Sequence, residues 1–222
     1  MEILVCLKQV PDDSVELHLK PGTQEVNLEG VTPVVNAFDT YALEMATRLK
    51  GAVGGSITAI TIGPEGAKDA VKTCLAVGAN QGYLSSDPAF EAADTLGKSR
   101  ILAAAVRHLE AEAGKPFDLI FCGREATDRA TGQVGPQLAE ALGVGLITDL
   151  VDIEQTGAGI CAKQETESGY RRGEAATPCV VTVNKPAYDP RYPTIQSKLA
   201  ARKMPIPVLS AAELDTREPG RP

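Results

Sequence analysis

The stretch DLIFCGREATDRATGQVG, residues 118–135, decides how the fold of this chain is interpreted. Its apolar run LIFC is typical of a buried strand, and the run stops at Gly123. A helical pattern begins near Gln133. Charged and polar side chains, together with glycines, fill the turn between these two elements. The stretch therefore predicts a strand–loop–helix unit with an unusually polar loop.

The same alternation of strand and helix covers most of the chain. Apolar, β-branched runs predict buried strands at 3–10, 56–63 and 118–123, with a weaker fourth strand at 81–86. Apolar residues at i, i+3 and i+4 spacing predict helices at 39–50, with Asp39 as the N-cap, at 65–77 and at 88–113. This order favours an α/β domain with an open, mostly parallel sheet and helices on both faces.

After Gly143 the pattern changes. Residues 150–165 are predicted to form two strands around a Gly-rich turn, and PCVVTVNKP at 178–186 predicts another strand. From Lys185 the chain is irregular and punctuated by prolines, with room for one short helix in TIQSKLAARK at 194–203. Composition alone favours a linker or a tail here, and a loop recognised by partners is the alternative.

Composition excludes several classes of protein. The chain has 222 residues, 43% of them hydrophobic, and we expect a single domain over 1–222. Its net charge of −7 argues against a nucleic-acid partner. No run of about 18 apolar residues or signal peptide is present, so we expect no membrane insertion. Five cysteines without CxxC spacing and only two histidines indicate no metal site and buried thiols in a reducing, cytoplasmic environment.

The loop after the third strand has the residue types of a nucleotide cradle. In open parallel sheets, ligands bind where the carboxyl ends of strands lead into helices. The free N–H groups of a helix start favour phosphate, and arginines such as Arg124 and Arg129 can add charge-assisted hydrogen bonds. The loops KQVPD and IGPEG lie in equivalent places. An ordinary capped turn with solvated charges explains the same residues equally well, since no GxGxxG or GxxxxGK[ST] motif is present.

No constellation of catalytic residues is apparent. His18 and His108 are interpreted as surface or partly buried residues, and neither GxSxG nor HExxH occurs. A nucleotide cradle without acid–base residues favours a cofactor carrier, in which the cofactor supplies the chemistry. We therefore predict no catalytic residues, and whether the chain is an enzyme subunit stays open.

Several motifs in a fixed order resemble the β subunit of electron transfer flavoproteins (the FixA/EtfB family), up to about residue 214. They are VCLKQVPD at 5–12, GVTPVVNAFDTYALEMATRLK at 30–50, ITIGP at 60–64, CLAVGAN at 74–80, LIFCGREATDRATGQVGPQLAEALG at 119–143, PCVVTVNKPAYDPRYPTIQSKLAARK at 178–203 and PIPVLSAAEL at 205–214. The resemblance implies a Rossmann-like, adenine-nucleotide-binding domain that pairs with a larger α subunit carrying FAD. The β subunit's own nucleotide is AMP in one branch and, in the flavin-bifurcating branch, a second FAD that accepts a hydride from NADH.

The resemblance also assigns the residues of the nucleotide site. They are Cys6, Asn36, Ala37, Phe38, Asp39, Ile62, Gly123, Arg124, Glu125, Ala126, Thr127, Asp128, Arg129, Ala130, Thr131, Gly132, Gln133 and Val134. The motifs look closer to the bifurcating branch than to the AMP branch. Glu125 stands where the family usually has Gln, and Ala130 replaces a usual acidic residue. The family commonly has a longer C-terminal arm, so a shorter tail at 204–222 implies truncation, a short natural form or a looser heterodimer.

The proline-punctuated segment 182–203 matches the partner-docking loop of the family. Ile195 holds the position of the hydrophobic anchor that enters a pocket on an acyl-CoA dehydrogenase or a similar flavoprotein dehydrogenase. Arg191, Tyr192 and Lys198 would flank it as a rim. The resemblance thus replaces the linker interpretation with a docking loop.

Two other hypotheses are less consistent with the sequence. A standalone adenine-nucleotide-binding regulatory protein of the stress type would bind AMP or ATP without flavin, but the chain length and the 182–203 segment argue against it. An NAD-dependent dehydrogenase would need a glycine fingerprint and a proton-transfer residue, and neither is found.

Overall fold

The computed structural model describes residues 1–12, 14–16, 18–157 and 159–214. The strands of the main sheet are β1 (Glu2–Leu7), β6 (Ser56–Ile62), β7 (Gln81–Ser85), β8 (Leu119–Gly123), β9 (Gly145–Thr156), β10 (Gly159–Thr166), β11 (Gly169–Ala176), β12 (Cys179–Val183) and β13 (Val208–Leu209). The helices are α1 (Ala37–Val53), α2 (Lys68–Val77), α3 (Thr95–Ala113), α4 (Val134–Leu142) and α5 (Ile195–Arg202).

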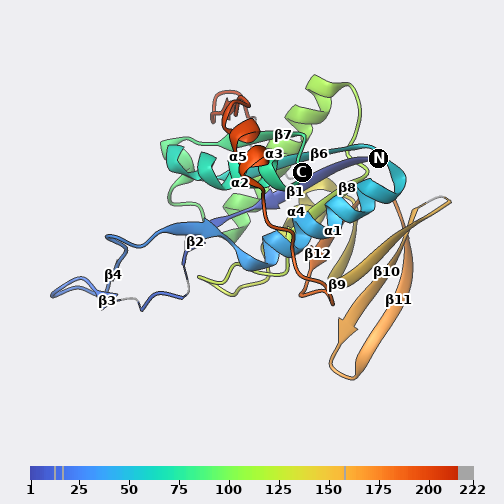
Figure 1. Cartoon of the computed structure of the whole chain (residues 1–222), viewed down its shortest axis with the longest axis horizontal. Helices are drawn as coiled ribbons and strands as arrows, with labels where there is room; N and C mark the ends of the chain where they lie inside the picture. The colour runs from blue at the N-terminus through green and yellow to red at the C-terminus, as the bar shows by residue number, and fades with distance from the viewer. Residues whose placement is uncertain (13, 17, 158, 215–222) are drawn as a thin grey trace, which may run out of the picture.

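One nine-stranded sheet organises the described residues, in the order β11-β10-β9-β12-β8-β1-β6-β7-β13 (Figure 1). The neighbouring strands in the part of the sheet ordered β9-β12-β8-β1-β6-β7-β13 are all parallel. β10 pairs antiparallel with both β9 and β11. The predicted α/β class with a mostly parallel sheet and C-terminal strands is confirmed.

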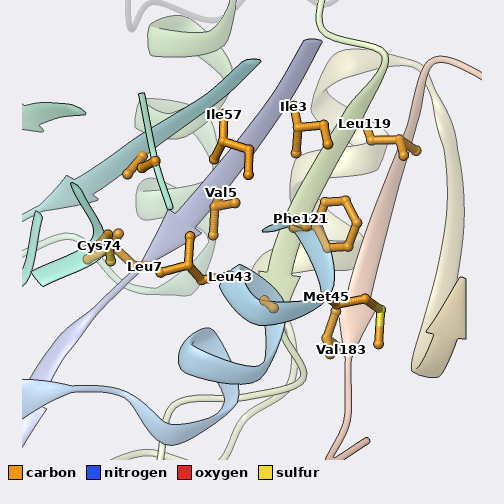
Figure 2. Close-up of a cluster of buried hydrophobic side chains, with 14 of the residues drawn as sticks. Ile3, Val5, Leu7, Leu43, Met45, Ile57, Cys74, Leu119, Phe121 and Val183 are labelled. Carbon is orange, nitrogen blue, oxygen red and sulfur yellow. The ribbon is translucent and has the colours of Figure 1, made fainter. Parts of the chain in front are cut away.

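Two apolar clusters cover the two faces of this sheet. Alternating residues of β1 divide between them: Ile3, Val5 and Leu7 contribute to one cluster, whereas Leu4 and Cys6 contribute to the other. The first cluster includes the apolar faces of α1 and α2, and Figure 2 shows α1 packing its side chains against β1 and β8. The second includes those of α3 and α4. Helices therefore cover both faces, as the alternation of elements predicted.

Some predicted boundaries are wrong for local reasons. The strand expected at 3–10 ends at Leu7, and β2 (Gln9–Pro11) instead pairs with β5 (Pro33–Val35) in a separate two-stranded sheet. The helix expected at 88–113 is interrupted: a short 3-10 turn at Pro88–Phe90 precedes α3, because the Asp94 carboxylate accepts the N–H of Gly97 and caps a new helix.

The antiparallel extension contains one strand more than predicted. The two strands expected at 150–165 correspond to β9 and β10, and β11 follows at the edge of the sheet. Its sequence GYRRGEAA has no alternation of apolar residues, and most of its side chains are exposed. Charged side chains on an edge strand discourage pairing with another chain. Because of the same charges, a search for apolar runs does not find such a strand.

A small arm lies outside the main sheet. An arm carrying β2, β5 and the small pair β3 (His18–Leu19) and β4 (Val26–Asn27) extends from the body (Figure 1). Within the described part of the chain, no helix combines the length and the apolar character that crossing a bilayer requires.

Candidate functional site

A cavity opens at the carboxyl ends of β1 and β8, where the strand order reverses. From β1 the sheet continues through β6 to β7 on one side, and β8 lies on the other side. Ligands of open α/β sheets bind at such switch points, because the loops there diverge. Counted as the space open to the centre of a water-sized sphere, the cavity has a volume of about 150 Å³.

Asn36 ties the start of α1 to the loop that follows β8. Its buried side chain donates from Nδ2 to the carbonyl oxygen of Glu125 (2.8 Å) and accepts at Oδ1 from the N–H of Thr127 (3.0 Å). Its own N–H donates to the carbonyl of Lys8 (2.9 Å). Asn36 is the N-cap residue of α1, but its side chain makes no capping bond, because the loop uses it. The residue therefore shapes one wall of the cavity.

Asp39 joins α1 to the ends of both central strands. Oδ2 accepts the N–H of Lys8 (2.7 Å), and Oδ1 accepts the N–H of Gly123 (3.1 Å). The residue is only 6% exposed. Burial raises the pKa of its carboxyl to about 7, although the hydrogen bonds from Lys8, Asn36 and Gly123 act in the opposite direction. The prediction that Asp39 caps the helix is wrong, since the helix begins before it.

Gly123 is required by the approach of α1 to β8. A Cβ at this position would lie 2.3 Å from Oδ1 of Asp39 and 2.8 Å from Cβ of Phe38. No other residue fits without moving the start of α1. Asp39 and Phe38 thus fill the space that this glycine leaves.

Basic side chains from separate segments line the cavity: Lys8, Lys98, Arg124 and Arg129. Nζ of Lys8 forms an ion pair with Asp128 (2.5 Å to Oδ1), and Nε of Arg124 lies 3.4 Å from Oδ1 of Asp149. Lys8 lines the cavity, whereas its partner Asp128 does not. The mouth of the cavity carries both signs of charge, with cations from several elements.

Most of the predicted nucleotide residues meet in this cavity. Those that line it are Cys6, Asn36, Asp39, Ile62, Gly123, Arg124, Glu125, Ala126, Arg129, Thr131, Gly132, Gln133 and Val134. Those that do not are Ala37, Phe38, Thr127, Asp128 and Ala130. Ala130 instead adopts a positive φ of 47° and donates its N–H to the carbonyl of Ala126 (2.7 Å), which shapes the loop.

Sequence reasoning missed other lining residues: Leu7, Lys8, Ala93, Asp94, Thr95, Lys98, Leu102, Cys122 and Gly135. Lys8 lies in the KQVPD loop, whose position after a strand was a usable signal. Thr95 and Lys98 had none, because the predicted helix 88–113 placed them in its interior. Only the break before α3 brings the start of that helix to the cavity.

The predicted docking segment 182–203 is attached to α1 by a buried carboxylate. Glu44, which is 1% exposed, accepts from Nε and Nη2 of Arg191 (2.7 and 3.0 Å) and from Nε of Arg48 (2.7 Å). The Arg48 guanidinium lies 3.8 Å from the ring centroid of Tyr188. Burial acts to raise the pKa of Glu44, but the bonds from the two arginines outweigh it and lower that pKa. Arg191 therefore holds the segment in place rather than standing free at a rim.

Beyond this attachment, the segment presents an apolar face. Tyr192 is 92% exposed, Ile195 81% and Leu199 53%. Ile195 and Leu199 lie one turn apart on α5, and Thr194 caps the start of this helix. The buried Ala201 lies on the opposite side of α5. Lys198 is exposed on α5. Ile195 and Leu199 on this helix, and Tyr192 just before it, are large exposed side chains that suit contact with another molecule.

We expect Glu44→Gln to lower the free energy of unfolding by about 1 kcal/mol at neutral pH. The loss is modest because Arg191 and Arg48 are half-exposed and water screens them. Because the folded pKa of Glu44 is lowered, its contribution is present above the unfolded value of 4.5 and is lost as the pH falls. Urea unfolding at neutral pH and at about pH 4 should show a shallower acid loss in the variant. Glu140→Gln, at an exposed position on α4, is the control, and equal acid slopes in all three proteins would contradict the assignment.

Fold and cavity together define an open α/β domain with a cavity at its topological switch point. A family model described as electron transfer flavoprotein domain matches residues 26–214. The electron transfer flavoprotein subunit beta of Megasphaera elsdenii is 43% identical over 214 residues, which cover 96% of this chain and 79% of that protein. The chain belongs to the electron transfer flavoprotein β-subunit (FixA) family.

Relatives with other names extend the comparison. The acryloyl-CoA reductase electron transfer subunit gamma of Anaerotignum propionicum is 37% identical, with 94% of this chain and 77% of that protein covered. The caffeyl-CoA reductase-Etf complex subunit CarD of Acetobacterium woodii is also 37% identical, covering 94% and 78%. The resemblance found in the sequence motifs is therefore confirmed, and electron transfer is the family's role.

Proposed function

We propose that this chain is the β subunit of a heterodimeric electron transfer flavoprotein and that its cavity holds an adenine nucleotide. The observation that carries the proposal is the cavity at the switch point between β1 and β8. Residues of the motifs NAFD and CGREATDRATGQV line it, and the family resemblance assigns these two segments to the nucleotide. We propose further that the chain acts as one unit, with 182–203 as its docking segment. The predicted tail at 204–222 needs correction, because Val208 and Leu209 within it form β13 and pair with β7.

The residues present fit a nucleotide. An apolar floor of Cys6, Ile62, Leu102 and Cys122 suits a planar base or ring system, and cations at the mouth suit phosphate. The starts of α3 and α4 meet here, joined by the bond from Oγ1 of Thr95 to Oε1 of Gln133 (2.9 Å). Such helix starts favour an anion. FAD would supply the redox chemistry when bound, and the chain's own residues bind, orient and shield it.

FAD is the nucleotide that we favour over AMP. The floor of the cavity is apolar along β1, β6 and β8, which suits a flavin ring. The motifs also look closer to the bifurcating branch, in which NADH is the hydride donor. Two relatives carry coenzyme A ester reductases in their names. We therefore propose an acyl-CoA dehydrogenase or reductase as the partner that docks on Tyr192, Ile195 and Leu199.

The test is the nucleotide content of the protein copurified with its larger subunit. We expect acid treatment to release two FAD per heterodimer, and NADH to bleach the flavin absorbance. Release of one FAD and one AMP would support the heterodimer but would indicate a simple electron shuttle instead of a bifurcating protein. A homodimer without flavin would reject the proposal in favour of a standalone nucleotide-binding protein.

A further inference from the structure

Lys98 occupies an unusual position at the wall of the cavity. It lies in the first turns of α3, where its N–H donates to the carbonyl of the N-cap residue Asp94 (2.9 Å). Its side chain is half-buried and lines the cavity. The chain thus places a partly desolvated ammonium at the positive end of a helix, which raises its electrostatic energy in the absence of an anion.

The cations around Lys98 differ in how they are neutralised. Lys8 has Asp128 and Arg124 has Asp149, as described above. Within residues 1–12, 14–16, 18–157 and 159–214, neither Lys98 nor Arg129 forms an ion pair with a carboxylate. Burial lowers the pKa of Lys98, the charges of Lys8 and Arg129 lower it further, and that of Asp128 acts weakly in the opposite direction. Lys8, Lys98 and Arg129 all line the same cavity.

We infer that Lys98 and Arg129, beside the Lys8–Asp128 pair, form the subsite for the phosphate groups of the bound nucleotide. This inference rests on the proposed function and deepens it, because neither the motifs nor the relatives' names assign a role to Lys98. Two basic side chains without carboxylate partners, at the mouth of a cavity with an apolar floor, complement a ligand with an anionic part and a ring system.

The distribution of acidic groups supports the same placement. Glu125 lines the cavity beside Asn36, which bonds its carbonyl oxygen. A phosphate next to the Glu125 carboxylate would meet a like charge. Asp94 is engaged with the N–H of Gly97 (2.8 Å), and Asp39 with the N–H groups of Lys8 and Gly123. Two of the four carboxylates in or beside the cavity lining, those of Asp39 and Asp94, are thus engaged with backbone N–H groups, and Asp128 pairs with Lys8.

The experiment compares Lys98→Met with the wild type, each as the full chain copurified with its larger subunit. Bound nucleotide is first exchanged out by dialysis, and binding of ADP, AMP and adenosine is then measured by equilibrium dialysis. We expect the variant to bind ADP and AMP roughly 10- to 100-fold more weakly, because a charge-assisted hydrogen bond is lost. Adenosine binding should be unchanged, and inorganic phosphate should compete with ADP in the wild type only.

Two further variants make the result specific. Lys115→Met removes the same charge at the opposite end of α3, where Lys115 pairs with Glu2 (2.8 Å), and should bind ADP as the wild type does. Lys98→Arg keeps the charge and should restore most of the ADP affinity. Unchanged ADP binding in Lys98→Met, or an equal loss for adenosine, would overturn the phosphate subsite. If the wild type binds none of the three compounds, the proposed function itself fails.

Discussion

Replacing Asp39 with alanine is expected to lower the free energy of unfolding by about 2–4 kcal/mol. The substitution removes the acceptor of two N–H groups, those of Lys8 and Gly123, which end the central strands β1 and β8. A buried N–H without a partner costs about 1–3 kcal/mol, and water entering from the cavity moderates that cost. Urea unfolding followed by circular dichroism measures the change. Asp69→Ala is the matched control, because Asp69 lies in the first turn of α2, and we expect it to cost less than about 1 kcal/mol.

The pH dependence separates the charge of Asp39 from its hydrogen bonds. The folded pKa of about 7 lies above the unfolded value of 3.8, so between these values the folded state holds a proton that the unfolded state has released. The contribution of Asp39 to stability therefore falls as the pH rises toward 7 and is constant above it. Asp39→Asn should remove this slope while still losing one N–H acceptor. A slope that persists in Asp39→Asn would assign it to another group.

The sequence predicted those parts of the fold that repeat a simple pattern. The parallel strands are apolar on both faces, and the helices between them carry one apolar stripe each, so both were recognisable from periodicity. The edge strand β11 was not, because charged and small residues that face water on both sides carry no period. Periodicity reports burial, and β11 has almost none.

The candidate site was predictable where a loop follows a strand directly, and not where distant elements meet. Gly123 and the residues after it were found because they interrupt a buried strand. The amide of Asn36, by contrast, bonds Glu125 and Thr127 across 89 and 91 positions of the chain. Asn36 was included in the predicted site through the family resemblance alone, because its local sequence, VVNAFD, suggests only a helix start. Lys98 was missed because its environment includes Lys8 and Arg129, which lie far from it in the sequence and line the same cavity only in the folded chain.

Ile195→Ala is expected to raise the KM for the partner dehydrogenase or reductase roughly 30-fold, the effect of losing an interface hot spot of about 2 kcal/mol. The prediction rests on the proposed docking segment. Ile195 is 81% exposed, so its truncation removes almost no contact within the chain. The free energy of unfolding should therefore change by less than about 0.5 kcal/mol. Stopped-flow reduction of the partner, at several partner concentrations, separates KM from the limiting rate.

Leu146→Ala is the control for this prediction, because Leu146 is a 39% exposed aliphatic residue of β9 outside the docking segment. It should leave the KM unchanged. Ile195→Ala should also retain the flavin content of the wild type, since α5 contributes nothing to the cavity lining. If the KM rises equally in both variants, the contact surface is broader than the Tyr192–Ile195–Leu199 face. If the KM rises in neither variant, α5 does not dock on the partner. The attachment of Arg191 to Glu44 would then contribute to stability alone.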